Sequence, residues 1–282
     1  MADLNKIIDA HSVIQNMVFD DSAVEMAASP WMLCSYLDRS DRHEIKKSIN
    51  VAIEKWLKPK MTPGQTKKIA RYIDKTTDIK KIVVLSEKYT SKHAMYRCLH
   101  KSLAELKNNF ELILISAPSD YDTISAHDFH QIIDTKDKAE SLSTVITAIT
   151  QLKPDLILYT SIGMAKWTIP LSNMRLAKSQ LMCYGHPASA MSQHIDYGAA
   201  STFPEHANAQ RFTLEKVTPF HDNYLYMEPH PDYQPQNIPT PNDGVVRIAV
   251  NSSLPKISNR FINLCSLALA HSTAPIEFHF FL

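Results

Sequence analysis

The chain has 282 residues, about the length of two ordinary domains. Hydrophobic residues make up 44%, enough for a substantial core. Its 30 basic and 29 acidic side chains give a formal net charge of +1, a balance that excludes general nucleic-acid or membrane-surface binding. The four cysteines are widely spaced, which favours reduced thiols over a disulfide framework. We find no secretory signal and no apolar run that could span a bilayer, so we expect a cytoplasmic protein.

Residues 1–78 are predicted to form a helical N-terminal region, because they contain no convincing strand. Apolar residues recur there at the spacing of an amphipathic helix face. A break at Thr62-Pro63-Gly64 precedes the last predicted helix of the region. The predicted helices cover 7–18, 31–37, 45–57 and 65–73.

From residue 79 the pattern changes to strands that alternate with helices. We predict strands over 81–86, 110–117, 131–133, 155–159 and 179–184, and helices over 91–108, 139–152 and between the last two strands. Ser91 is the predicted N-cap of the helix over 91–108. This alternation is typical of a parallel sheet with both faces covered, so residues 79–228 are predicted to form an α/β, Rossmann-like lobe. A GxGxxG motif is missing, which argues against a nicotinamide site.

Residues 229–244 are rich in proline and are predicted to be an extended linker. A strand over 245–250, a helix from 256 or 257 to 270 and a strand over 275–282 follow it. Ile257, Phe261, Leu264, Cys265 and Ala268 are spaced for burial on that helix. A single βαβ unit cannot bury both of its faces. Residues 245–282 therefore either extend the first sheet or begin a second lobe in a fragment of a longer protein, and we favour the fragment.

A turn of sequence Gly185-His186-Pro187 directly follows the strand predicted over 179–184. Ligands of open α/β sheets bind at the carboxyl ends of the strands, and small neighbours leave space for a ligand to approach. His186 is therefore a candidate to contact a phosphate or a sugar hydroxyl, or to act as an acid or base. A histidine that merely completes a tight turn explains these residues equally well.

His93, Arg97 and His100 share one side of the helix predicted over 91–108, because they are spaced by four and three residues. This helix follows the first strand, so its first turn should lie at the ligand-binding end of the sheet. The exposed amides of a helix N-terminus favour an anion there. The three side chains are candidates for the polar face of a cleft, although spacing alone favours an ordinary solvent-facing helix side.

Asn251, Ser253 and Lys256 lie between the strand over 245–250 and the helix that follows it. Small polar residues and a lysine at a helix N-terminus can form a phosphate cradle, although the P-loop spacing is missing. Taken alone, these residues are explained more simply by a surface lysine after a proline turn. The 13 histidines show no HxxxH or HExxH spacing, so no metal site is predicted.

Three segments together carry a family resemblance: KHAMYRCLH (92–100), SIGMAKWTIPLSNMRLAKSQLMCYGHPASAMSQHIDY (161–197) and IAVNSSLPKISNRFI (248–262). They resemble the bacterial cytoplasmic glycosyltransferases that modify high-molecular-weight adhesins. Those enzymes belong to glycosyltransferase family 41, alongside the O-GlcNAc transferases. The resemblance covers roughly residues 80–282, and the helical N-terminus is compatible with the all-α domain that precedes the catalytic lobes of such enzymes.

The resemblance implies a GT-B fold, in which two Rossmann-like lobes face a cleft and the second lobe holds most of a nucleotide sugar. It also implies inverting, metal-independent transfer of a hexose from UDP-glucose or another UDP-hexose to asparagine in Asn-X-Ser/Thr of an acceptor protein, such as an adhesin. Lys256 then matches the lysine that contacts the donor diphosphate, with Asn251 and Ser253 beside it. His186 matches the histidine of the turn that lines the donor site.

On the acceptor side, His93, Arg97 and His100 match polar residues that line the first lobe's part of the cleft, and we expect His93 to join His186 and Lys256 in catalysis. In such enzymes most of the second lobe lies beyond the position of Leu282, so the chain is expected to hold only its start. Two alternatives stay open. One is a truncated, non-catalytic remnant that binds a partner protein; the other is an unrelated α/β sugar-phosphate or nucleotide enzyme in which the turn is coincidental.

Overall fold

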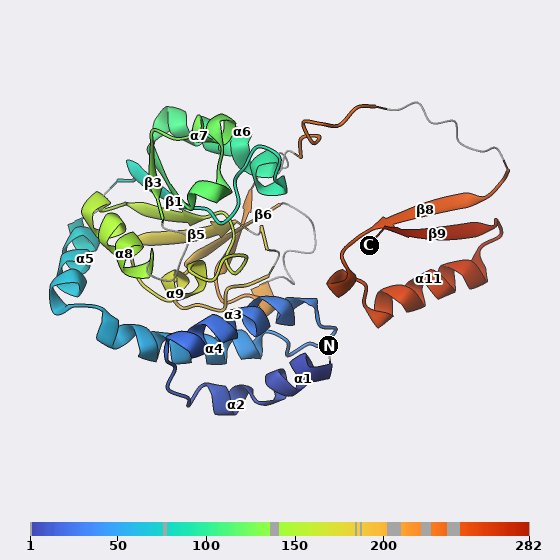
Figure 1. Cartoon of the computed structure of the whole chain (residues 1–282), viewed down its shortest axis with the longest axis horizontal. Coiled ribbons are helices and arrows are strands. Elements are labelled where there is room, and N and C mark those ends of the chain that lie inside the picture. The colour runs from blue at the N-terminus through green and yellow to red at the C-terminus, as the bar shows by residue number, and fades with distance from the viewer. Residues whose placement is uncertain are drawn as a thin grey trace.

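The computed structural model describes residues 2–75, 78–135, 141–183, 185–186, 188–201, 210–220, 227–235 and 243–281. Several sequence-based expectations lie outside these residues: Tyr184, Pro187, the first residues of the helix predicted over 139–152, positions 236–242 of the linker, and Leu282. Figure 1 shows a helical region at the N-terminus, a sheet with its helices, and a small C-terminal unit at one side.

The helical region is built from amphipathic helices that follow one another along the chain. They are α1 (Ala2–Asp9), α2 (His11–Ile14), α3 (Asp21–Leu33), α4 (Glu44–Leu57) and α5 (Pro63–Lys75), with 3-10 turns at Cys34–Tyr36 and Lys58–Lys60. The helix predicted over 31–37 corresponds to the end of α3 and the 3-10 turn after it. Helix α3 begins at Asp21, because Asp20 caps it by accepting a hydrogen bond from the Ala23 amide at 2.7 Å. The predicted helix over 7–18 is divided into α1 and α2.

The main sheet has seven parallel strands in the order β3-β2-β1-β4-β5-β6-β7. They are β1 (Lys81–Leu85), β2 (Glu111–Ser116), β3 (Gln131–Asp134), β4 (Leu156–Tyr159), β5 (Ser179–Cys183), β6 (Tyr197–Ser201) and β7 (Lys216–Phe220). The sequence did not predict β6 and β7. Small residues dominate β6, and β7 contains Pro219, which an edge strand tolerates.

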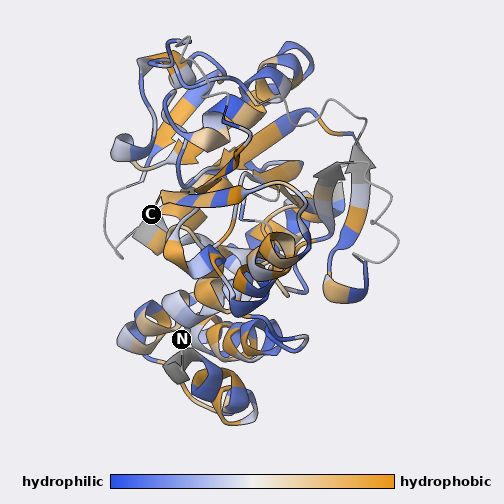
Figure 2. Cartoon of the chain, turned by 90° about the vertical axis from the view of Figure 1, so that its right-hand side faces the viewer, coloured by the Kyte–Doolittle hydropathy of each residue, from blue (hydrophilic) through white to orange (hydrophobic). Residues whose placement is uncertain are grey.

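Helices cover both faces of this sheet, as predicted. They are α6 (Ala94–Asn109), α7 (Thr123–Ala126), α8 (Ser141–Leu152) and α9 (Thr168–Ser172). Successive residues of β1 point to opposite faces: Val84 packs in the cluster that contains Leu99 of α6, whereas Val83 packs in the cluster that contains α8 and the helical region. Figure 2 shows hydrophobic residues concentrated along these strands. The helical region and the sheet therefore share one continuous core.

The C-terminal unit consists of β8 (Val246–Asn251), a 3-10 turn (Leu254–Lys256), α11 (Asn259–His271) and β9 (Ile276–Phe281). Its two strands pair in parallel as a separate sheet, so the unit does not extend the seven-stranded one. Cys265 of α11 is buried as predicted, but Leu264 is 61% exposed. A two-stranded sheet offers α11 too little surface to cover its apolar side chains. Among the described residues, no helix is long and apolar enough to cross a membrane.

Candidate functional site

The candidate site lies at the carboxyl edge of the main sheet, where β1, β4 and β5 end side by side. The strand order reverses between β1 and β4, and ligands of open α/β sheets bind beside such a switch point. Three loops leave the sheet here: residues 86–93 after β1, 160–167 after β4, and the glycine–histidine turn after β5. These loops set the positions of the candidate side chains.

Glu87, in the loop after β1, holds the loop after β4 in place. Its fully buried carboxylate accepts hydrogen bonds from the amides of Gly163 and Ala165, both at 2.9 Å, and from the hydroxyls of Ser161 and Thr168. Burial raises the pKa of Glu87, and the hydrogen bonds oppose that shift. The switch point is thus organised by a buried acid that the sequence analysis missed.

Gly185 is required by the close approach of the turn to its neighbours. A Cβ atom at this position would lie 2.5 Å from the side chain of Met95 and 2.8 Å from the Thr160 carbonyl oxygen. The amide of Gly185 donates to that same carbonyl oxygen at 3.3 Å. Only glycine therefore lets the chain turn away from β5 at this point.

His186 is buried, with 3% of its surface exposed. Its Nε2 atom lies 3.1 Å from Oγ of Ser35, and its ring meets the Tyr36 ring edge-on, with 5.8 Å between the centroids. Burial, followed by the positive charges of Lys46 and Lys256, lowers the pKa of His186 to about 4. His186 is therefore neutral near pH 7, and it serves there as a hydrogen-bonding group.

The helical region supports this turn through a buried lysine. Lys46 of α4 is fully buried, donates from Nζ to the Ser189 carbonyl oxygen at 2.9 Å, and lies 4.1 Å from the centre of the Trp31 ring. Burial lowers the pKa of Lys46 to about 8. The Ser189 hydroxyl in turn donates to the buried Glu215 at 2.7 Å. The backbone that follows His186 is therefore held from two sides.

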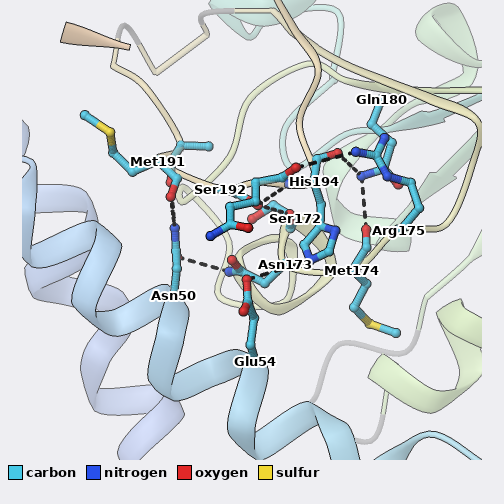
Figure 3. A network of polar contacts seen from close by, with 12 residues as sticks. Asn50, Glu54, Ser172, Asn173, Met174, Arg175, Gln180, Met191, Ser192 and His194 are labelled. Carbon is cyan, nitrogen blue, oxygen red and sulfur yellow. Dashed lines mark hydrogen bonds and ion pairs between the residues drawn. The ribbon is translucent and has the colours of Figure 1, made fainter. Parts of the chain in front are cut away.

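Asn50, one turn further along α4, extends the same support. Its Nδ2 donates to the carbonyl oxygens of Ala190 (3.0 Å) and Met191 (2.8 Å), while its Oδ1 accepts from Trp31 (2.9 Å) and Asn173 (3.0 Å). Figure 3 shows Asn50 pointing from its helix toward Met191 and Asn173. Lys46 and Asn50 are four residues apart, so the sequence predicts that they share a helix face. The spacing does not predict that this face contacts the His186 turn.

Lys256 approaches the site from the C-terminal unit. A pocket of about 230 Å³ is lined by residues 35–38, Arg42, Lys256 and Ser258. His186 does not line this pocket but contacts two residues that do, Ser35 and Tyr36. The structure therefore brings Lys256 and His186 to the same place. Asn251, Ser253 and Lys256 are all exposed.

The predicted polar face of α6 contacts a later segment of the chain, residues 227–232. Arg97 donates to the Glu228 carbonyl oxygen at 2.8 Å, and the Glu228 carboxylate pairs with His100 at 2.9 Å and with Lys101 at 3.0 Å. Arg97 and His100 therefore hold residue 228, directly before the linker, against α6. They lie on the face of α6 opposite Leu99, which is buried against the sheet.

His93 caps α6, which corrects the prediction that Ser91 would do so. Nδ1 of His93 accepts from the Met95 amide at 3.2 Å. The Ser91 hydroxyl instead donates to Asp122 at 2.7 Å, so it is not available to the helix. Burial, followed by the charges of Lys88 and Arg97, lowers the pKa of His93.

No protein-family model matches the chain. Two curated proteins match it at 24% identity over 264 residues: the UDP-glucose:protein N-beta-glucosyltransferases of Actinobacillus pleuropneumoniae serotype 5b (strain L20) and serotype 7 (strain AP76). Each match covers 89% of this chain. The chain resembles the protein glycosyltransferases.

The fold agrees with this resemblance. A solved structure of an O-GlcNAc transferase mutant from Thermobaculum terrenum matches this chain with a TM-score of 0.60 and 13% sequence identity. The match covers 92% of this chain and 48% of the O-GlcNAc transferase chain. The predicted fold class, a GT-B-like Rossmann lobe behind a helical region, is confirmed. The chain spans 40% of the length of the two curated relatives. The role of each site residue and the division into domains stay predictions.

Proposed function

We propose that the chain forms the first lobe and the start of the second lobe of an inverting, metal-independent protein glycosyltransferase. The donor is a UDP-hexose, with UDP-glucose as the first candidate. The acceptor is asparagine in Asn-X-Ser/Thr of a protein such as an adhesin. The observation that carries the proposal is the match to two UDP-glucose:protein N-beta-glucosyltransferases over 89% of the chain, and the shared fold supports it.

The proposed chemistry places negative charge on the departing UDP as the bond between sugar and phosphate breaks. A preorganised cation stabilises such charge most effectively where little water surrounds it. Lys256 is the proposed cation, because its side chain lines the pocket in front of the His186 turn. Asn251, the last residue of β8, and Ser253, which follows it, are proposed to assist in donor binding.

The acceptor is proposed to bind on the α6 side of the sheet. Of the three residues predicted there, Arg97 and His100 contact residue 228. His93 lies at the start of α6, next to the loop that leaves β1, and is the residue proposed to contact the acceptor. Its lowered pKa leaves it neutral near pH 7.

A transfer assay on the full-length product of the reading frame that encodes this chain tests the proposal. The protein is incubated with UDP-glucose and an Asn-X-Ser/Thr peptide, and the glycosylated peptide is measured by mass spectrometry. Lys256→Ala should reduce the rate by about 100-fold or more. Arg260→Ala is the matched control, because it removes an exposed positive charge from the same unit outside the pocket lining. Equal rates for both variants would remove Lys256 from the mechanism.

The alternative, a non-catalytic protein-binding module, is favoured by one observation. Within the described residues, the second sheet has two strands and Asn251, Ser253 and Lys256 are exposed, so few groups surround a donor. A chain that binds the peptide but transfers no hexose from any UDP-sugar would support this alternative.

A further inference from the structure

The segment between α3 and α4, residues 34–43, joins the helical region to the His186 turn. Ser35 and Tyr36 both contact the His186 ring. Lys46, just beyond the segment, binds the backbone of Ser189 at 2.9 Å. Because the segment and the turn are anchored to each other, the side chains on the outer side of the segment have a defined position.

This outer side forms one wall of the pocket, and the C-terminal unit forms the opposite wall. Residues 35–38 and Arg42 belong to the helical region, whereas Lys256 and Ser258 come from the unit that follows the linker. The two groups are more than 200 residues apart in the sequence, so only folding brings them together.

The charges of the pocket indicate an anionic ligand. Arg42 and Lys256 line opposite walls, and neither has an ion-pair partner among the described residues. Nη1 of Arg42 donates to the Leu37 carbonyl oxygen at 3.0 Å, and this bond orients the guanidinium. The other N–H groups of the guanidinium can then donate to a ligand. Asp38 is the one acid in the described lining. A guanidinium, an ammonium and a hydroxyl together suit the oxygen atoms of a phosphate group.

We infer that Arg42 and Ser35 of the helical region bind the phosphate groups of a nucleoside diphosphate sugar from the side opposite Lys256. The inference rests on the proposed function, because it identifies the ligand of the pocket with the sugar donor. In this arrangement His186 is a positioning residue: it holds the Ser35 hydroxyl at the pocket and does not itself line it. The helical region is then part of the donor site.

Isothermal titration calorimetry measures the binding of UDP to the 282-residue chain. Uridine, which lacks the phosphate groups, is the control ligand. Arg42→Ala should weaken UDP binding by about tenfold or more, because hydrogen bonds to a charged group are lost. Ser35→Ala should weaken it by roughly threefold to tenfold. Neither change should alter the binding of uridine.

Arg39→Ala is the matched control, because Arg39 lies in the same segment but pairs with Asp9 at 2.8 Å and Asp41 at 2.7 Å, outside the pocket lining. It should leave UDP binding unchanged. Arg42→Gln is a second variant in case the truncated side chain disturbs the Leu37 contact, and it should lose affinity to a similar extent. Circular dichroism checks that each variant is folded.

The outcomes separate this inference from the proposed function. If Arg42→Ala and Arg39→Ala bind UDP equally while Lys256→Ala binds it weakly, the helical wall is outside the donor site and the inference is overturned, although the proposed function stands. If Lys256→Ala also binds UDP normally, the pocket is not the donor site, so this inference and the role proposed for Lys256 are both overturned. Loss of affinity for uridine in Arg42→Ala would also overturn the assignment to phosphate.

Discussion

The main sheet and the C-terminal unit use the same parallel βαβ pattern but differ in how much they bury. In the main sheet, strand residues such as Leu114 are completely buried, because helices cover both faces. In the C-terminal unit, Leu264, Leu267 and Phe281 are 61%, 56% and 59% exposed. An apolar pattern is therefore enough to specify a strand or a helix, whereas burial needs a second layer of structure to pack against.

The largest difference in stability between the two regions is expected from matched leucine truncations. Leu114→Ala should lower the free energy of unfolding by about 2–5 kcal/mol, because it leaves a cavity in a closed core. Leu264→Ala should change it by less than about 0.5 kcal/mol, because that side chain already meets solvent. Denaturant titration measures both values. Similar losses in the two variants would mean that α11 is buried in solution.

An intermediate effect is expected from lowering the pH, because one buried and one half-buried histidine lie where the helical region meets the main sheet. Burial lowers the pKa of His186 to about 4 and that of His43 to about 3, whereas an unfolded histidine titrates near about 6.5. The unfolded chain therefore takes up protons first as the pH falls. The stability contribution is fully present above about pH 6.5 and is lost progressively toward the folded pKa values, for a total on the order of a few kcal/mol.

Unfolding of the wild type and His186→Gln at pH 7.5 and pH 5 tests this expectation. The variant should lose less stability between the two pH values than the wild type does. His271→Gln is the control, because this histidine is exposed on α11 of the C-terminal unit. An equal pH dependence in the wild type and His186→Gln would contradict the buried, neutral state of His186.

The smallest effect is expected where the linker meets α6. Glu228→Ala removes the ion pair with Lys101 and the contact with His100, and the Lys101 side chain is 51% exposed. The free energy of unfolding should fall by less than about 1 kcal/mol, because the Arg97 contact to the residue 228 carbonyl oxygen remains. Thermal unfolding measures the change. A loss as large as that of Leu114→Ala would show that the segment belongs to the core.

Much of the main sheet could be predicted, and the exceptions have physical reasons. The strands β1, β2, β4 and β5 are short apolar runs between helices, and their local pattern is sufficient. In contrast, β6 is the sequence YGAAS and β7 is KVTPF. Neither has a strong apolar pattern, and each becomes a strand because it pairs with the preceding strand at one end of the sheet.

The candidate site shows the same division. The glycine–histidine turn was predicted from local signals, since glycine, histidine and proline follow a buried strand. The residues around His186 were not predicted: Ser35 is 151 positions away, and Lys46 is 143 positions from the Ser189 carbonyl oxygen that it binds. Glu87 was also missed, because a single acid after a strand gives no sign that the loop after β4 will surround it.

The sequence alone was sufficient for the Rossmann-like pattern, the position of His186 at a strand end, and the resemblance to protein glycosyltransferases, because these depend on neighbouring residues and local order. Only the tertiary structure placed Ser35 and Arg42 of the helical region opposite Lys256, and only it showed that Arg97 and His100 contact residue 228. These contacts join segments that are distant in the chain, and burial and charge become defined only when such segments pack together.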